Sequence, residues 1–168
     1  MLFKLPSDIR TAQESDIPQL RRLVNAAYQE LADLGLNFTG TYQDDEITRE
    51  RMKDAEVYLL HRGGELIASM NVSLQEADGQ ICLYINQLAV RPEYKRQGLG
   101  SYLLDLAEQR AEAAGIERLR LDTAILALHL LGIYRRRGFV EVEEVQWEGK
   151  TYRSIIMEKR LKKLDSGS

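Results

Sequence analysis

Cysteine is nearly absent from this chain of 168 residues, in which Cys82 is the only one. A disulfide framework and a zinc site built of cysteines both need more than one cysteine, so neither is available. Cys82 alternates with apolar neighbours in a strand-like run, which favours a small core residue over a nucleophile. Proteins of reducing compartments use cysteine in this sparing way, and we therefore expect a cytoplasmic protein.

Long apolar runs and a strong net charge are also missing. No run approaches the length of a membrane span, and the first residues lack the apolar core of a signal peptide. The formal net charge of -3 gives no reason to expect a nucleic-acid partner. We expect one domain over 1–165, a flexible tail over 166–168, no membrane or nucleic-acid partner, and a monomer or homodimer.

The sequence does contain a turn with two glycines between a strand-like and a helix-like segment. The strand pattern covers 81–90, and the apolar spacing typical of a helix begins directly after Gly100. Gly98 and Gly100 remove side chains where the backbone must curl, so successive N–H groups can converge on an anion at the positive end of the helix. This arrangement predicts a pyrophosphate-binding turn that needs no metal.

The residues around this turn exclude two common phosphate-binding motifs. A P-loop would need Gly-Lys-Ser or Gly-Lys-Thr, and Leu103 stands where the dinucleotide fingerprint has its third glycine. The six residues from Lys95 to Gly100 instead resemble the acetyl-CoA loop of the GNAT superfamily of N-acetyltransferases. That loop begins with Gln or Arg, whereas this chain has Lys95. The change matters little because main-chain amides hold the phosphates, while Lys95 and Arg96 keep positive charge nearby.

A second motif makes the resemblance more specific. The run from Ile133 to Phe139 is similar to the Leu-Tyr-x-x-x-Gly-Phe motif of the same family, in which a glycine ends a helix before a strand. In the family, the tyrosine of this motif points toward the thioester sulfur. The usual Asn and Ala of this helix fall on Ala127 and Leu130, so the hydrogen bond of that Asn to the pantetheine arm is not carried over.

The order of the predicted elements resembles the whole GNAT topology. Periodicity and turn residues predict strands over 9–12, 57–61, 66–74, 81–90, 118–121, 140–147 and 152–157, and helices over 17–34, 47–54, 101–114 and 125–136. The resemblance therefore implies an α/β fold of the GNAT acyl-CoA N-acyltransferase type. Its centre would be a mixed, mostly antiparallel twisted sheet of about seven strands, flanked by about four helices.

The resemblance also implies an activity and the residues that perform it. An acyltransferase of this kind moves an acetyl group from acetyl-CoA, its cosubstrate, directly to a primary amine of a small molecule or protein, without a metal. Tyr134 would protonate the departing sulfur, although its alternative role is that of a core aromatic with a solvated hydroxyl. A main-chain N–H near a β-bulge at 88–90 would hold the thioester carbonyl oxygen. The implied CoA-binding residues are Leu88, Ala89, Val90, Lys95, Arg96, Gln97, Gly98, Leu99, Gly100 and Ser101.

The acceptor site is expected beside the transfer centre, in the loop over 35–45. Phe38 and Tyr42 are predicted to form walls of the acceptor pocket, or alternatively to anchor the loop to the core. The acids at 44–46 would either attract a cationic amine or stabilise the start of the following helix. The basic residues at 135–137 would either face a CoA phosphate or complement the helix dipole.

The sequence does not assign a general base. Several family members carry a carboxylate on the strand before the loop, but the matching run from Tyr84 to Gln87 has no acid. Asp122 is a possible base acting through water, and a helix cap near Ile125 is the favoured alternative. Two other functions therefore stay open: a CoA-binding module without turnover, and an interaction protein that docks through the loop over 35–45.

Overall fold

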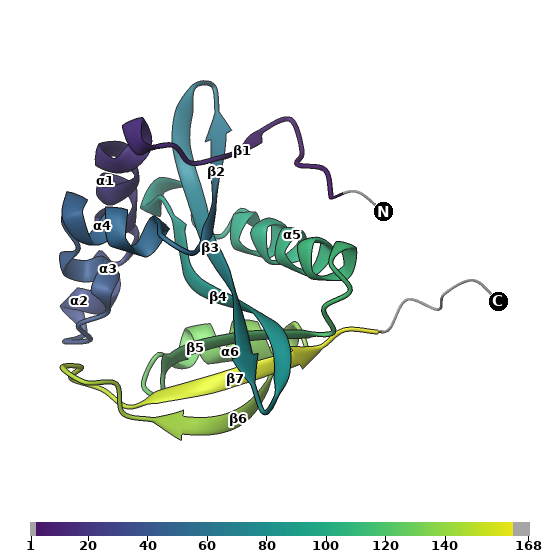
Figure 1. Ribbon diagram of the computed structural model, residues 1–168. Coiled ribbons are helices and arrows are strands. Elements are labelled where there is room, and N and C mark those ends of the chain that lie inside the picture. Colours follow the sequence, from purple (N-terminus) through teal and green to yellow (C-terminus); the bar gives the residue numbers. More distant parts are fainter. Residues whose placement is uncertain (1–2, 163–168) are drawn as a thin grey trace.

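A seven-stranded sheet forms the centre of the structure, a computed structural model that describes residues 3–162. Its strands are β1 (Ile9–Thr11), β2 (Glu56–Arg62), β3 (Glu65–Ala77), β4 (Gln80–Val90), β5 (Arg118–Ala124), β6 (Val140–Val145) and β7 (Ser154–Arg160). Within the described residues they lie in the order β1-β2-β3-β4-β5-β7-β6, and every neighbouring pair is antiparallel except β4 and β5. The predicted mixed and mostly antiparallel sheet is thus confirmed (Figure 1).

Helices cover both faces of this sheet. The α-helices are α1 (Ile17–Ala27), α2 (Gln29–Asp33), α3 (Thr39–Tyr42), α4 (Asp45–Met52), α5 (Leu99–Ala113) and α6 (Leu128–Arg136), with short 3₁₀ turns at Glu14–Asp16 and Pro92–Tyr94. In Figure 1 the first four helices gather on one side of the sheet, and α5 lies on the other.

Two apolar cores hold α1 and α5 on the two faces of the sheet, because side chains of a strand alternate between those faces. On β2, Tyr58 packs into the core that contains Leu103 of α5, while Val57 and Leu59 pack into the core that contains Leu20 of α1. All five side chains are buried. Each fully buried leucine contributes roughly 1.5–3 kcal/mol relative to an exposed one, so both layers are firmly attached.

The N-terminal helices differ from the prediction in detail. The helix predicted over 17–34 is divided at Tyr28, which leaves helical geometry (φ −96°, ψ 1°). The Tyr28 ring lies so close to Gly40 that a Cβ there would be 2.8 Å from it. The loop predicted over 35–45 contains α3, whose four residues are too few to show a helical period. The described residues therefore have more helical segments than the sequence predicted.

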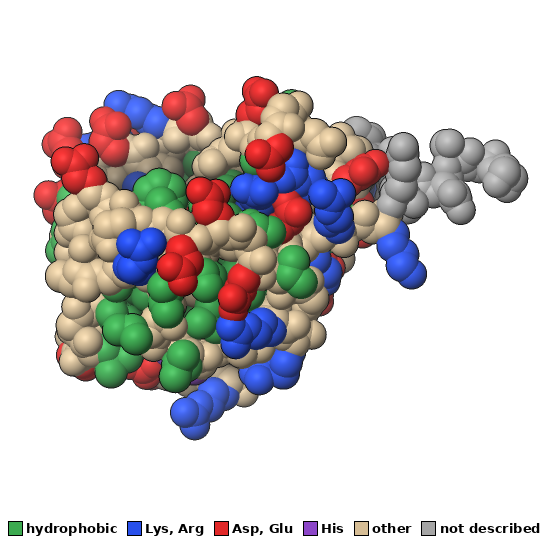
Figure 2. All heavy atoms as spheres, turned by 90° about the horizontal axis from the view of Figure 1, so that it is seen from below, with side chains coloured by type: hydrophobic (Ala, Val, Ile, Leu, Met, Phe, Trp, Pro, Cys, Tyr) green, Lys and Arg blue, Asp and Glu red, His purple; other side chains and the backbone are tan. Residues whose placement is uncertain are grey.

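Strand β6 forms one edge of the sheet and exposes several of its side chains. Figure 2 shows hydrophobic side chains together with charged ones on the face seen from below. The exposed large hydrophobic residues of the C-terminal half are Leu126, Leu128, Ile133, Val140, Val142 and Trp147. On β6 itself, glutamates follow the valines, and charge at a sheet edge opposes pairing with another strand.

Two points concern the tail and the helices of the chain. The flexible tail predicted over 166–168 lies outside the described residues. Between residues 3 and 162, no helix combines the length and the apolar character that crossing a membrane requires.

Candidate active site

The central sheet opens between its two parallel strands. β4 and β5 pair only at Leu83 with Leu119 and at Tyr84 with Arg120. Just beyond this point β4 has a bulge, because Gln87 and Ile85 face consecutive residues of β3 and the residue between them is unpaired. A bulge bends its strand and increases the local twist. The two strands therefore separate toward the carboxyl end of β4.

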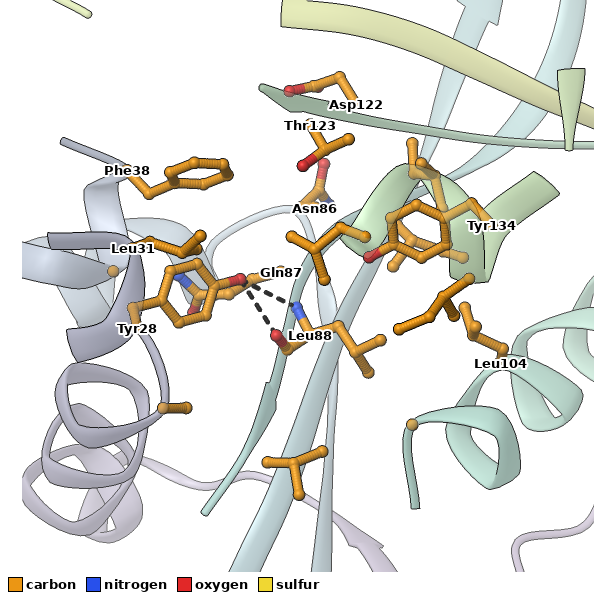
Figure 3. Close-up of a pocket in the computed structure, with 18 of the residues that line it drawn as sticks. Tyr28, Leu31, Phe38, Asn86, Gln87, Leu88, Leu104, Asp122, Thr123 and Tyr134 are labelled. Atoms are coloured by element: carbon orange, nitrogen blue, oxygen red, sulfur yellow. Dashed lines mark hydrogen bonds between the residues drawn. The ribbon is translucent and has the colours of Figure 1, made fainter. Parts of the chain in front are cut away.

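A cleft of about 1500 Å³ lies at this separation. Figure 3 shows its two walls, one from the N-terminal helices and one from α5 and α6, with β4 between them and β5 above. Residues on these surfaces include Tyr28, Leu31, Phe38, Asn86, Gln87, Leu88, Leu104, Asp122, Thr123 and Tyr134. Pockets for one small ligand usually measure about 300–1,000 Å³, so this cleft has room for two substrates at once.

The glycine turn provides an anion site at one end of the cleft. Arg96 (φ 66°) and Gly98 (φ 80°) both adopt left-handed conformations, which curl the backbone before α5. Gly98 is the N-cap of α5 and makes no side-chain capping bond, so the first N–H groups of this 15-residue helix face the cleft without a cap. Successive N–H groups at a helix N-terminus bind phosphate oxygens well.

Basic side chains near this turn have two different roles. Lys95 donates from Nζ to the Ala27 carbonyl oxygen at 2.9 Å and lies 3.6 Å from Glu30, so it ties the turn to the end of α1. Arg96 lines the cleft and has no hydrogen bond or ion pair among residues 3–162. Arg136 also lines the cleft, whereas its neighbours on either side pair with Glu141 and Asp105.

Leu88 and Val90 present main-chain groups to the cleft, whereas Ala89 does not. The Arg91 N–H donates to the Ile67 carbonyl of β3 at 2.8 Å, and alternate residues of a strand direct their main-chain groups to opposite sides. Ala89 therefore faces β3, and it does not line the cleft, nor does Gln97. The other predicted CoA-binding residues, among them Leu99 and Ser101, do line it.

Tyr28 closes the open edge of β4 at Leu88. Its hydroxyl donates to the Leu88 carbonyl oxygen at 3.1 Å and accepts a long hydrogen bond from the Leu88 N–H at 3.4 Å (Figure 3). Burial raises the pKa of Tyr28, so the hydroxyl stays protonated. The spacing of apolar residues predicted Tyr28 only as part of a helix face, and this contact across 60 residues of sequence leaves no local signal.

Tyr134 lies on the opposite wall, and Figure 3 shows its hydroxyl directed into the cleft near Leu88. Its ring packs edge-on against Phe139, with centroids 5.9 Å apart. The Tyr134 hydroxyl takes part in none of the hydrogen bonds found among the described residues. Burial raises the pKa of this phenol above its ordinary value of 10.0, so Tyr134 holds a proton that it can donate.

Asp122 brings a carboxylate to the cleft from β5. It accepts a short hydrogen bond from the Tyr84 hydroxyl, and burial together with this carboxylate raises the pKa of Tyr84. Helix α6 begins only at Leu128, and its N-cap residue Ala127 makes no side-chain capping bond. The interpretation of Asp122 as a helix cap is therefore wrong, because β5 continues past the predicted end of the strand.

Aromatic rings form the far end of the cleft. Phe38 stacks on Tyr152 with centroids 4.7 Å apart and an interplanar angle of 19°, and it meets Tyr28 edge-on at 5.9 Å. The predicted partner of Phe38, Tyr42, lies outside this cleft. Tyr42 is 55% exposed, and its ring lies beside the ammonium of Lys150.

The loop that carries Phe38 is clamped to the turn between β6 and β7. Lys150 donates to the Asn37 carbonyl oxygen and to the Thr39 hydroxyl, both at 3.0 Å. The Asn37 side chain in turn donates to Gly149 at 2.9 Å and accepts from the Thr151 N–H at 2.8 Å. Segments from the two ends of the sequence therefore enclose the aromatic end of the cleft together.

Replacing Phe38 with alanine tests the role of this end. Phe38→Ala should raise KM for amines with apolar groups by about 3- to 10-fold, because an aromatic pair contributes about 0.5–1.5 kcal/mol beyond its buried area. CoA affinity, measured by calorimetry, should stay unchanged. Tyr42→Ala is the matched control from the same loop and should alter neither quantity. A Tyr42→Ala variant with changed amine preference would move the acceptor pocket to the outer side of the loop.

Two further observations concern a thiol in the cleft and the possibility of a metal site. Cys82 also lines it, but burial raises the pKa of this thiol, so it is a poor nucleophile. Residues 3–162 contain no group of three or more His, Cys, Asp or Glu side chains that could hold a metal ion.

Known proteins share both the sequence and the fold of this chain. The acetyltransferase (GNAT) family model matches residues 18–139. An S-alkylcysteine N-acetyltransferase of Bacillus subtilis is 28% identical over 146 residues, which cover 83% of this chain and 82% of that protein.

Solved structures resemble the fold over nearly its whole length. The ribosomal-protein-S18-alanine N-acetyltransferase of Escherichia coli has a TM-score of 0.72 at 19% identity, and the match covers 95% of this chain and 97% of that one. A GNAT family acetyltransferase of Elizabethkingia anophelis, solved with acetyl-CoA bound, has a TM-score of 0.65 at 18% identity and coverages of 93% and 100%. With the family model covering most of the residues described, the chain belongs to the GNAT family of acetyltransferases and is an acyltransferase.

Proposed function

We propose that this enzyme transfers an acetyl group from acetyl-CoA directly to a primary amine in the cleft between β4 and β5. The observation that supports this most strongly is the convergence of three groups with different tasks. The Leu88 N–H is a donor, the Tyr134 hydroxyl is a proton source, and the Asp122 carboxylate is a proton acceptor, and all three line one cleft. The free main-chain N–H groups at the N-terminus of α5 then bind the CoA phosphates.

These groups account for every proton in the reaction. Asp122, directly or through a water molecule, takes a proton from the ammonium form of the acceptor, whose nitrogen then attacks the thioester carbon. The carbonyl oxygen becomes an oxyanion that accepts from the Leu88 N–H, displacing its long bond to Tyr28. The C–S bond breaks, and Tyr134 protonates the departing CoA thiolate. The second proton lost by the attacking nitrogen passes through a water molecule to the Tyr134 phenolate and restores the phenol, while Asp122 releases the first proton to solvent. Tyr84, which donates to Asp122, orients that carboxylate.

A panel of amines tests this proposal. Initial rates of CoA thiol release from acetyl-CoA should rise on addition of an acceptor amine, with the N-acetylated product identified by mass spectrometry. The panel should include S-alkylcysteines and a peptide with N-terminal alanine, since these represent the two acceptor types named for the relatives. Thiol release that no amine accelerates would contradict the proposal.

Asp122→Asn should reveal the base through the pH dependence of the rate. At pH 7 we expect kcat/KM to fall by roughly 10²-fold, the lower end of general-base effects. The deficit should shrink as the pH approaches the pKa of the acceptor amine, about 8 for an α-amino group, because the fraction of neutral amine then rises without help. A constant deficit at all pH values would assign Asp122 a structural role instead.

The cleft also weighs against one alternative function, and three further features complete the proposal. A CoA-binding module without turnover was favoured by the missing acid between Tyr84 and Gln87, but Asp122 on the neighbouring strand β5 provides an acid in the same cleft. We propose a single acetyltransferase domain over 1–165. A cytoplasmic location and a monomeric or homodimeric state stay proposals too; the first rests on the single, buried cysteine.

A further inference from the structure

Arg51, at the end of α4, lines the cleft without a carboxylate partner. Its Nη2 donates to the main-chain oxygen of Asn86 at 2.9 Å, which directs the guanidinium to the bulge of β4. Its Nε is buried and has no hydrogen-bond partner among the described residues. None of the ion pairs within residues 3–162 includes Arg51. Asn86 itself is at the centre of the cleft in Figure 3.

The surroundings of Arg51 leave one of its N–H groups without an acceptor among the described residues. Burial raises the pKa of the Tyr28 and Tyr152 hydroxyls, and the positive charge of Arg51 acts in the opposite direction on both, which places it near the aromatic end of the cleft. Arg51 is half-buried, and its buried Nε–H group, which has no acceptor among the described residues, is unfavourable because it has lost its hydrogen bond to water. An anionic group of a bound ligand would accept the unused hydrogen bond of the guanidinium and balance its charge.

Other basic residues on the described surface of the cleft are accounted for differently. Arg120 pairs with Glu158 at 3.0 Å, Arg137 pairs with Asp105, and Lys95 is held by α1. Lys150 directs its ammonium to the Asn37 carbonyl oxygen and the Thr39 hydroxyl, which fix it in the clamp of the loop. Arg96 and Arg136 flank the glycine turn, where the CoA phosphates are expected. Arg51 is on the other side of Leu88 along β4, so the phosphates of a CoA molecule seated on that turn do not reach it.

We propose that Arg51 binds the carboxylate of the acceptor, and that the acceptor is a free α-amino acid with an apolar side chain. This inference rests on the proposed acetyl transfer and adds the class of the amine. A guanidinium binds a carboxylate through two parallel hydrogen bonds, which fixes both position and orientation. A peptide N-terminus carries an amide in place of the carboxylate and leaves the charge of Arg51 unpaired.

The dimensions of the cleft agree with this assignment. Arg51 is attached at Asn86, and the acyl carbonyl is held at Leu88, two residues further along β4, which is at most about 7 Å because the bulge at Asn86 shortens the strand. An α-amino acid has its amine and carboxylate on one carbon atom, so with a hydrogen bond of about 2.9 Å it spans that distance. Its third substituent then points toward the aromatic end, where Leu31, Phe38 and Tyr152 provide an apolar surface.

The test compares three amines that differ only beside the nitrogen: S-benzyl-L-cysteine, its carboxamide, and 2-(benzylthio)ethylamine. The wild-type enzyme should prefer the free acid by about 10- to 150-fold in kcat/KM, the value of a charged hydrogen bond of about 1.5–3 kcal/mol. In Arg51→Gln this preference should vanish through a raised KM for the acid alone, and Arg51→Lys should restore part of it. A purely structural role of Arg51 would lower the rates of all three amines together.

Arg49→Gln is the matched control, because Arg49 is on the same helix and pairs with the exposed Glu14. It should keep the wild-type preference. Equal use of acid and carboxamide by the wild type, or a preference that survives in Arg51→Gln, would overturn this inference while leaving acetyl transfer intact. If none of the three amines is acetylated, binding of the free acid to the enzyme–CoA complex is measured by calorimetry. Binding that depends on Arg51 but is not followed by acetyl transfer would support the carboxylate site and contradict the proposed function. If the acid neither binds nor is acetylated, the carboxylate site and the proposed function are both contradicted.

Discussion

Gly100→Asp should abolish CoA binding in a protein that remains folded. Gly100 is in the first turn of α5, and a Cβ built there meets no other atom within 4 Å. The new carboxylate would occupy the space expected for the pyrophosphate and repel it by roughly 1–4 kcal/mol at contact distance, before any steric cost. We expect the Kd for CoA, measured by calorimetry, to rise by about 10²-fold or more.

The free protein should not suffer from this substitution. An acid in the first turn interacts favourably with the helix dipole, so the thermal stability should be equal or slightly higher. Gln109→Asp adds the same charge on an exposed part of α5 and should bind CoA normally. Gly98→Asp is a less clean variant, because Gly98 has a φ of 80° that a side chain disfavours. Unchanged CoA affinity in folded Gly100→Asp would remove the phosphates from this turn.

Tyr134→Phe should lower turnover by roughly 10²-fold or more without loss of stability or CoA affinity. The phenylalanine keeps the edge-on contact with Phe139, and the lost hydroxyl makes no hydrogen bond with the described residues. In the wild type the raised pKa of Tyr134 keeps the phenol protonated as the pH rises, so its proton is still available at pH 10. The wild-type rate should therefore show no alkaline decline below that pH.

A series of thioesters makes this test sharper. Acetyl-CoA should be affected by the loss of the hydroxyl more than an acetyl thioester of a strongly acidic thiol, which leaves without a proton. Rate losses of equal size for the two thioesters, or none for either, would return Tyr134 to the role of a core aromatic and leave the acid unidentified.

Local chemistry explains why part of the site could be predicted from the sequence. Gly98, Gly100 and Tyr134, for which we propose roles in the site, belong to short segments whose turns and helices have recognisable residues. The periodicity of apolar residues and the turn residues between the segments likewise predicted which segments form the strands of the sheet. These features depend on neighbours a few residues away, and the structure places all three residues on one cleft.

The part of the site that the sequence does not predict depends on contacts between segments that are far apart in the chain. Tyr28 fits the apolar period of its helix, yet its hydroxyl bonds to Leu88 on β4. Arg51 belongs to a short, highly charged helix, where most basic residues are solvated, and only the fold brings it to the bulge at Asn86. Asp122 resembled a cap because the end of β5 was predicted three residues too early. The spacing of residues along the chain contains no information about these tertiary contacts.

Direct transfer of the acetyl group is the central claim, and a single-turnover experiment tests it most directly. The enzyme is mixed with acetyl-CoA, first without and then with the acceptor amine, and its intact mass, the free thiol and the acetylated amine are measured together. Because Cys82 is buried with a raised pKa, we predict no acetylated enzyme, and one N-acetylated amine for each thiol released, only when the acceptor is present. An acetyl group that remains on the protein, or thiol released without acetylated amine, would contradict direct transfer.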